Sequence, residues 1–303
     1  MAFGAVSDVW FVILLTRAWT PPTPAIPVTQ MPLAAALTVG AIVAVGLFAY
    51  GAALNDVLDQ RHDGTFSPDR PIPAGRIRSS QAIIVAIGSL LIAILAGATL
   101  GWWGLRLTLL VSLGILFYNA VGKFIPAVGL VTIGLIHALH MAIPNVHITF
   151  TLPIWLVMTH AMAIAWGAHR LEDKRPRLNT NAAVAVIAGW IFWSAAILSW
   201  GIMRHDQWPE TWDWYDLVWP VFAVAGFIVI IRWKTIMGGA IAAEKLKRYG
   251  AMWQSLYSSS WLLALGLPTQ AMWIGLFALA GFAAMTLIKE VTGLMNRPLT
   301  YRG

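Results

Sequence analysis

Apolar runs of about 18 residues or more recur along this chain, and they leave few folds open to it. A hydrocarbon layer about 30 Å thick is crossed by about 20 helical residues, so each run is long enough for one span. Only 11% of the residues are charged, whereas a soluble domain carries about 25%. The short alternating segments of a transmembrane β-barrel are not evident. We therefore predict an all-α, polytopic membrane bundle that forms a single domain over residues 1–303.

Ten apolar runs qualify as spans. Arg17 and the segment TPPTPAIP interrupt the first run, and only Pro268 and Thr269 separate the last two. Because the last two are so close, we predict nine to ten transmembrane helices. The predicted spans cover residues 5–28, 32–55, 81–101, 103–121, 125–144, 150–168, 182–203, 216–232, 250–267 and 270–288.

The basic residues predict the orientation. Of the 20 Lys and Arg residues, all but Arg17, Arg106 and Arg204 fall on the side of the loop after Asn55; Arg17 is ambiguous. The positive-inside rule then makes that loop and both termini cytoplasmic, in an inner or plasma membrane surrounded by lipid. No basic stripe lies beside a soluble fold, so nucleic acid is not an expected partner. An interfacial aromatic belt is indicated on the opposite side by Trp208, Trp212, Trp214 and Trp219.

The second predicted span ends in side chains that all chelate cations: Asn55, Asp56, Asp59 and Asp63. Asn55, Asp59 and Asp63 are spaced i, i+4, i+8, and Asp56 borders the face they share on a continuing helix. Like charges at this spacing repel one another, and a helix C-terminus disfavours carboxylates. A divalent cation would reverse both penalties, and these hard oxygen ligands suit Mg²⁺. The alternative is a solvated acidic loop.

A basic, proline-rich loop follows this acidic motif. Arg70 precedes Pro71 and Pro73, which stiffen the chain, and a turn at Ala74-Gly75 leads to Arg76. Guanidinium groups bind phosphate oxygens bidentately, so Arg70 and Arg76 beside a Mg²⁺ site suit a diphosphate. The alternative is that they only follow the positive-inside rule.

The two segments together resemble the UbiA superfamily of intramembrane prenyltransferases. NDVLDQRHD meets the family's first motif, NDxxDxxxD, and RPIPAGR is similar to its RP-[LI]-P-[SA]-G element. The resemblance implies helices around a central cavity that opens near the cytoplasmic side. It also implies a Mg²⁺-dependent enzyme that moves a prenyl group from a polyprenyl diphosphate to an aromatic or other lipophilic acceptor. Asn55, Asp56, Asp59 and Asp63 are then the expected metal ligands, with Asp59 and Asp63 catalytic.

Two further segments are compared with the family. Tyr118 and Lys123 are similar to its Tyr and Lys after the fourth span, which implies that Lys123 is catalytic and contacts diphosphate. The family's second acidic motif, DxxDxxxD, falls on AHRLEDKRPRLNT. There Arg170 and Arg177 replace the outer aspartates, and Asp173 remains at a metal-ligand position beside Glu172.

The altered second motif leaves two interpretations. In the first, the second Mg²⁺ is lost and the diphosphate is neutralised by Arg170, Lys174 and Arg177, with Arg170 catalytic. In the second, catalysis is lost and the chain is a lipid-, quinone- or pigment-binding subunit, packed by its Trp-rich faces against a membrane-protein partner. We favour the enzyme.

Three other features are weighed. His137 and His140, in the fifth predicted span, are expected to be hydrogen-bonded within the bundle rather than to ligate a metal. AEKLKR, before the ninth predicted span, is expected to form a solvated cytoplasmic helix at the cavity mouth. Arg17 is either a functional group at membrane depth or an interfacial residue.

Overall fold

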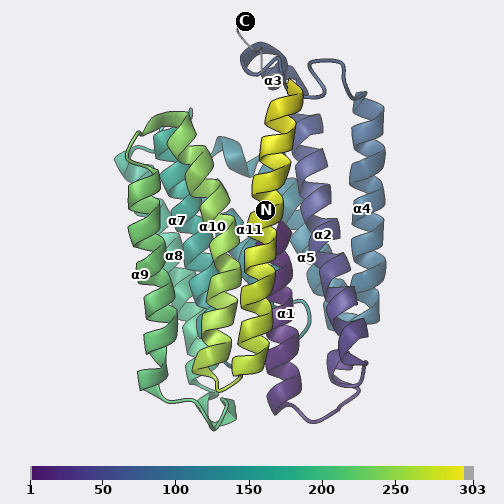
Figure 1. Cartoon of the computed structure of the whole chain (residues 1–303), viewed down its shortest axis with the longest axis vertical. Helices are drawn as coiled ribbons and strands as arrows, with labels where there is room; N and C mark the ends of the chain where they lie inside the picture. Colours follow the sequence, from purple (N-terminus) through teal and green to yellow (C-terminus); the bar gives the residue numbers. More distant parts are fainter. Residues whose placement is uncertain (1, 297–303) are drawn as a thin grey trace, which may run out of the picture.

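A computed structural model describes residues 2–296 of the chain, without the side chains of residues 289, 290 and 292–296. It consists of eleven α-helices joined by short loops and 3₁₀ turns, and the described residues form no β-strand (Figure 1). The all-α prediction is confirmed. The helices are α1 (Ala2–Trp19), α2 (Leu33–Leu58), α3 (Gln60–Phe66), α4 (Ser79–Thr99), α5 (Gly101–Ala120), α6 (Pro126–Met141), α7 (Leu152–Leu171), α8 (Thr180–Ile202), α9 (Val218–Lys234), α10 (Gly239–Ala264) and α11 (Pro268–Asn296).

Within residues 2–296, seven segments are both long and apolar enough to cross a membrane: α1, α2, α4, α5, α8, residues 214–234 and α11. α6 is apolar but only 16 residues long, and α7 and α10 do not reach the same hydropathy. α7 and α10 carry histidine, lysine and serine side chains toward the interior, which lowers their hydropathy, and all three helices pack within the bundle. The number of spans, predicted as nine to ten, stays a prediction.

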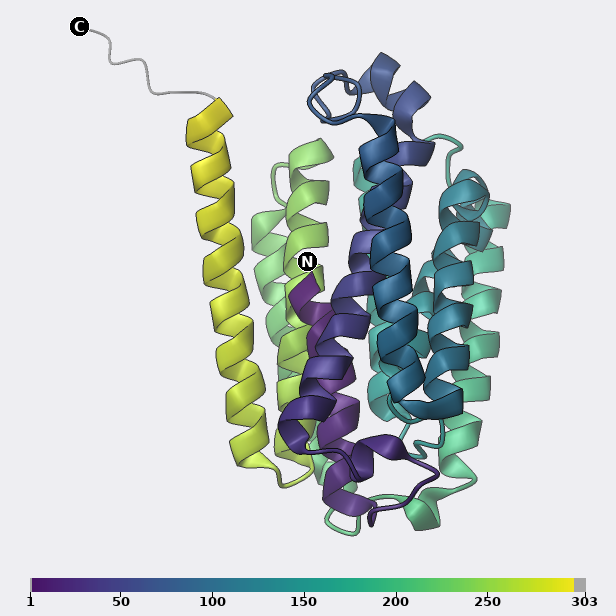
Figure 2. The ribbon, with the colours of Figure 1, turned by 90° about the vertical axis from the view of Figure 1, so that its right-hand side faces the viewer.

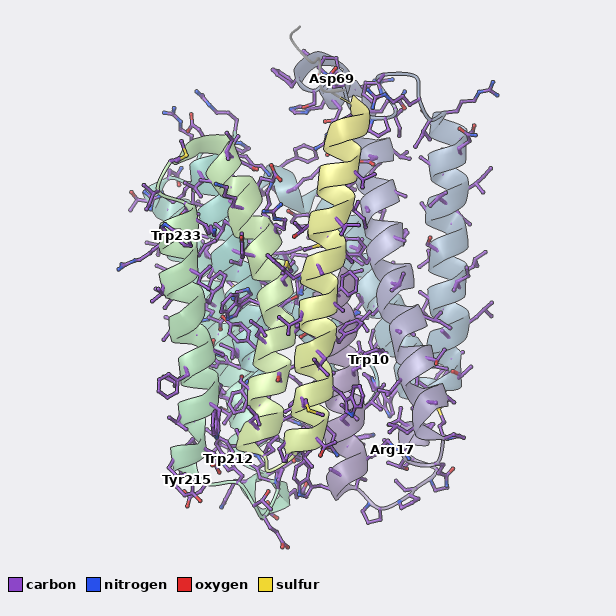
Figure 3. The ribbon with its side chains drawn as sticks, in the orientation of Figure 1. Trp10, Arg17, Asp69, Trp212, Tyr215 and Trp233 are labelled. Carbon is purple, nitrogen blue, oxygen red and sulfur yellow. The ribbon has the colours of Figure 1, made fainter. Side chains whose placement is uncertain are left out.

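The first helix differs from its prediction. The expected span of residues 5–28 is too long, because α1 ends at Trp19 where the proline-rich segment begins. Arg17 explains how that segment is held: its guanidinium donates to the carbonyls of Val28 (2.7 Å) and Met31 (2.6 Å). Arg17 lies at the end of the bundle opposite Asp69, which follows α3, so its contacts are those of a structural clamp (Figure 3).

α1 is the central helix. Phe11, Val12 and Leu15 pack into a buried cluster with residues of α6, α7 and α10. Val9 and Ile13, on its other side, pack into a second cluster with residues of α2, α4 and α5. α1 therefore joins the two halves of the bundle. Its first turn lies about halfway along the bundle's height (Figure 1).

The outer helices present apolar side chains to the surroundings. Ile84 of α4 is 70% exposed, Val229 of α9 is 68% exposed and Leu279 of α11 is 65% exposed. α11 packs against α10 and α1 and stands at one edge of the bundle (Figure 2). An outward apolar surface of this kind requires lipid rather than water around it, so the chain is an integral membrane protein.

Candidate active site

The acidic motif lies where α2 passes into α3. α2 ends at Leu58 and α3 begins at Gln60, but the helical hydrogen bonds continue across the junction. The Asp59 amide donates to the Asn55 carbonyl at 2.9 Å, and the Asp63 amide donates to the Asp59 carbonyl at 2.8 Å. Asn55, Asp59 and Asp63 therefore follow one another on successive turns, as their spacing predicts.

Two of the four motif side chains converge on Lys123. The Lys123 ammonium, in the 3₁₀ turn before α6, donates to Asp59 Oδ1 at 2.5 Å and to Asn55 Oδ1 at 3.2 Å. This residue lies more than sixty positions away in sequence. Both oxygens thus already face a cation at the membrane edge, in the way that two ligands of a bound metal would.

The other two motif side chains converge on Arg70. Its guanidinium donates to Asp63 Oδ2 at 2.9 Å and lies 3.7 Å from Asp56 Oδ1. The Asp63 carboxylate is buried, so Arg70 supplies the charge that makes its burial tolerable. Ile72, buried in the same loop, and the left-handed turn at Gly75 (φ 71°) fold the chain back so that Arg70 faces the motif.

A large cavity opens beside this motif. Its volume is about 590 Å³, and its walls come from α1, α2, α5, α6 and α10. Asn55, Asp56 and Arg70 line its polar end. From Asn55 the lining continues down α2 to Ala44, about 16 Å along the helix axis, past the apolar side chains of Leu47 and Phe48. We call this the larger cavity.

A second cavity of about 310 Å³ lies between α6, α7 and α10. We call it the smaller cavity. Three lysines line it: Lys123, Lys174 and Lys247. The two cavities share a wall of six residues, which are Tyr118, Ile133, His137, Lys247, Ala251 and Gln254. A molecule in one cavity is therefore in reach of a molecule in the other.

The second motif is organised around Glu172, the C-cap residue of α7. Its Oε1 accepts from Lys247 at 2.5 Å, and its Oε2 lies 3.0 Å from the Lys174 ammonium, as an ion pair. Burial of Glu172 opposes its ionisation, but hydrogen bonds from Lys247 and Lys174 outweigh burial and lower the pKa of Glu172. One carboxylate therefore holds two ammonium groups at the edge of the smaller cavity.

The remaining predicted site residues lie outside both cavities. Asp173 has an exposed side chain and a left-handed backbone (φ 44°), and it pairs with Arg177 at 3.2 Å. The hydrogen bond from Arg177 lowers the pKa of Asp173. Arg76 and Arg170 are also exposed, and neither they nor Arg177 line a cavity. Among the described residues, no three His, Cys, Asp or Glu side chains are grouped so as to hold a metal by themselves.

The histidines of α6 face the larger cavity. His137 Nδ1 lies 3.1 Å from the Gln254 side-chain amide of α10, the kind of hydrogen bond within the bundle that we expected. His140 Nε2 is buried and has no hydrogen-bond partner among the described residues. A third histidine, His160, bonds to the Gly250 carbonyl at 2.9 Å and to the Tyr257 hydroxyl at 3.1 Å.

Sequence reasoning missed Lys247 and Gln254 as cavity residues. AEKLKR is not a separate helix, because α10 runs unbroken from Gly239 to Ala264. A signal was present in the spacing: Lys247, Ala251 and Gln254 stand at i, i+4 and i+7, which places them on one face of that helix. All three line both cavities.

Several known proteins resemble this chain. Residues 9–237 match the model of the UbiA prenyltransferase family. A segment of 83 residues is 35% identical to digeranylgeranylglyceryl phosphate synthase of Methanothrix thermoacetophila, covering 27% of this chain and 31% of the relative. Another of 58 residues is 41% identical to the bacteriochlorophyll synthase 33 kDa chain of Rhodobacter capsulatus, covering 19% of each. The chain thus matches less than a third of the length of either relative.

Among solved structures, the chain is similar to the apo structure of a UbiA homolog from Aeropyrum pernix K1. The two superpose with a TM-score of 0.47 and 16% sequence identity, over 94% of this chain and 98% of the other.

Proposed function

This chain belongs to the UbiA prenyltransferase family, and we propose that it is a Mg²⁺-dependent enzyme of the membrane. It transfers a prenyl group from a polyprenyl diphosphate to an aromatic or other lipophilic acceptor. The observation that carries the proposal is the pairwise convergence of the four motif side chains on Lys123 and Arg70, at the polar end of a cavity whose remaining wall is largely apolar.

The donor set fits Mg²⁺. This ion is usually held by one or two carboxylates together with phosphate oxygens and water, so three grouped acids are not needed. Asn55, Asp56, Asp59 and Asp63 would hold it at the junction of α2 and α3. When bound, Mg²⁺ supplies positive charge that stabilises a departing diphosphate.

The chain's own cations would share that task. Lys123 and Arg70 now satisfy the motif oxygens, and phosphate oxygens offer them equally good charge-assisted hydrogen bonds. In the reaction the bond between the first prenyl carbon and the diphosphate oxygen breaks, and the diphosphate keeps the electron pair. The acceptor supplies the electron pair of the new bond and gives up a proton to the released diphosphate, within an apolar wall that excludes water from the allylic cation.

The arginines that line neither cavity have less direct roles in the proposed reaction. Arg76, Arg170 and Arg177 are exposed, and they would attract an anionic donor by long-range electrostatics. The catalytic role predicted for Arg170 requires its side chain to reach the diphosphate from the end of α7. A metal role for Asp173 requires its carboxylate to leave Arg177, and both roles stay predictions.

The first test is turnover by the purified protein. Radiolabelled geranylgeranyl and farnesyl diphosphate are offered with a mixed panel of aromatic and lipid acceptors, with and without Mg²⁺. Asp59→Asn keeps the size of the side chain but removes its charge, and we expect turnover to fall about 100-fold or more. Asp69→Asn is the matched control, because Asp69 is an exposed acid of the following loop (Figure 3).

The outcomes separate the two functions. Product that needs Mg²⁺, survives Asp69→Asn and is lost in Asp59→Asn supports the enzyme. A wild-type protein that neither binds nor consumes either diphosphate contradicts it, and the chain would then be the non-catalytic lipid-, quinone- or pigment-binding subunit.

A further inference from the structure

We propose that the smaller cavity is an anion-binding subsite for the acceptor, a proposal that rests on the proposed transferase function. Lys174 and Lys247, both bound to Glu172, would receive a carboxylate or phosphate group carried by a lipophilic acceptor. The altered second motif would then have exchanged a metal site for an anion receptor.

The charges around the smaller cavity favour an anion. Its lining residues include three lysines and neither aspartate nor glutamate. Lys123 is neutralised by Asp59, but Glu172 is a single carboxylate shared by Lys174 and Lys247. One positive charge is left over beside the cavity, so an anionic ligand is favoured there.

The two ammonium groups are also held in position. A free lysine side chain loses rotamer freedom when it binds a ligand, and that loss weakens binding. Glu172 accepts a hydrogen bond from Lys247 at 2.5 Å and forms an ion pair with Lys174 at 3.0 Å, so part of this rotamer freedom is already lost before a ligand binds. Each ammonium has three donors, of which Glu172 takes one, so donors remain for a second anion.

The position of the subsite assigns it to the acceptor rather than to the donor diphosphate. Arg70, Asn55 and Asp56 line only the larger cavity, whose apolar wall suits a prenyl chain. Lys174 lines only the smaller cavity. An acceptor anchored by its anion there would meet the prenyl group at the shared wall, where Tyr118, His137 and Gln254 lie.

The test compares acceptors in matched pairs: a lipophilic phenol with a free carboxylate against its methyl ester, and a lipid alcohol with a phosphate monoester against the same lipid without it. We expect wild type to prefer the anionic member of the accepted pair. Lys174→Ala should raise the KM for that acceptor about tenfold or more and should remove the preference for the anion. The KM for the prenyl diphosphate should stay within about twofold.

Two control variants distinguish the loss of an anion contact from a general loss of structure. Lys174→Arg retains the charge and should restore most of the acceptor affinity. Lys245→Ala removes a lysine of the same region that lines neither cavity, and should leave both KM values unchanged. Elution volume and thermal stability in detergent are measured for each variant, and Lys174, in an exposed loop, should tolerate replacement.

Three results would overturn the inference. Equal use of acid and ester by wild type, with normal binding of the prenyl diphosphate, removes the anion subsite and leaves the transferase intact. A rise in the diphosphate KM in Lys174→Ala, with the acceptor KM unchanged, assigns the lysines to the donor instead. Failure of wild type to bind any prenyl diphosphate rejects the transferase itself, and the acceptor subsite with it.

Discussion

Lys123 and Arg70 each lie between two of the oxygen ligands predicted for magnesium. Unpaired acids on successive turns would repel one another, and the buried Asp63 would be costly without a counter-charge. Lys123 and Arg70 offset both the repulsion between the acids and the cost of burying Asp63, without a bound metal. The residues that would bind the diphosphate therefore also preserve the metal ligands in their positions.

The lowered pKa of Glu172 predicts how stability depends on pH. Its pKa lies below the usual value of 4.5, so the ionised carboxylate stabilises the fold above that pH, and this stability is lost as pH falls through the lowered pKa. We expect Glu172→Gln to lower the melting temperature at pH 6 to 7, and the difference from wild type to shrink below pH about 4.5. The measurement is thermal unfolding in detergent from pH 7 to 3.5.

A control distinguishes the ion pairs of Glu172 from the effect of removing any carboxylate. Glu210→Gln changes an exposed glutamate in the loop that carries Trp212, and we expect no pH-dependent difference from wild type. A stability difference for Glu172→Gln that is equally large at pH 7 and pH 3.5 would contradict the role of its charge.

Among the helices, α6 positions Lys123, for which we propose a catalytic role, by close backbone packing. Its first turn lies directly against the Gly122–Phe124 turn that carries Lys123. A Cβ on Gly129 would lie 2.6 Å from the Gly122 carbonyl oxygen and 3.3 Å from the Lys123 Cα. Both are backbone atoms, which cannot rotate away, so only glycine fits at this position.

Gly129→Ala should therefore push the Lys123 turn away from Asp59. We expect a loss of about 1–3 kcal/mol of stability from overpacking, together with a fall in turnover. Gly88→Ala in α4 is the matched control, because no atom lies within 4 Å of its added Cβ. That control should be neutral or stabilising by up to about 1 kcal/mol. Equal effects of the two substitutions on melting temperature and activity would argue against the packing explanation.

At the scale of the whole molecule, the bundle has two chemically different ends. α3 and the basic loop of Arg70 lie at one end, and the aromatic residues Trp212 and Tyr215 lie at the other (Figure 3). The predicted cytoplasmic position of the α3 end rests on the positive-inside rule.

The absence of cysteine makes this orientation directly measurable, because any introduced thiol is the only one in the chain. We expect Gly64→Cys, on exposed α3, to react with a membrane-impermeant maleimide in inside-out vesicles alone. Asp206→Cys, in the exposed loop between α8 and α9, should react in right-side-out vesicles alone. The reverse pattern would invert the orientation, and labelling of both variants from one side would contradict the arrangement of the helices.

The membrane class, the helical fold and most helix positions follow from local sequence. Apolar runs predicted at 81–101, 125–144 and 182–203 lie within a few residues of α4, α6 and α8, because hydrophobicity and helix length are properties of each segment alone. The prediction fails where a helix leaves the apolar layer. α10 begins at Gly239 rather than at residue 250, since its first turns are polar and helical at once.

The partners of the charged residues depend on contacts between distant segments. One short stretch of sequence predicts a cluster of hard oxygen ligands at a membrane edge, from Asn55, Asp56, Asp59 and Asp63. Lys123 meets Asp59, and Lys247 meets Glu172 across more than seventy residues, only because helix packing brings those turns together. The exposure of Asp173 and Arg170 is decided in the same way. Spacing along one helix predicts which side chains share a face, whereas the cavity that this face borders is set by its neighbours.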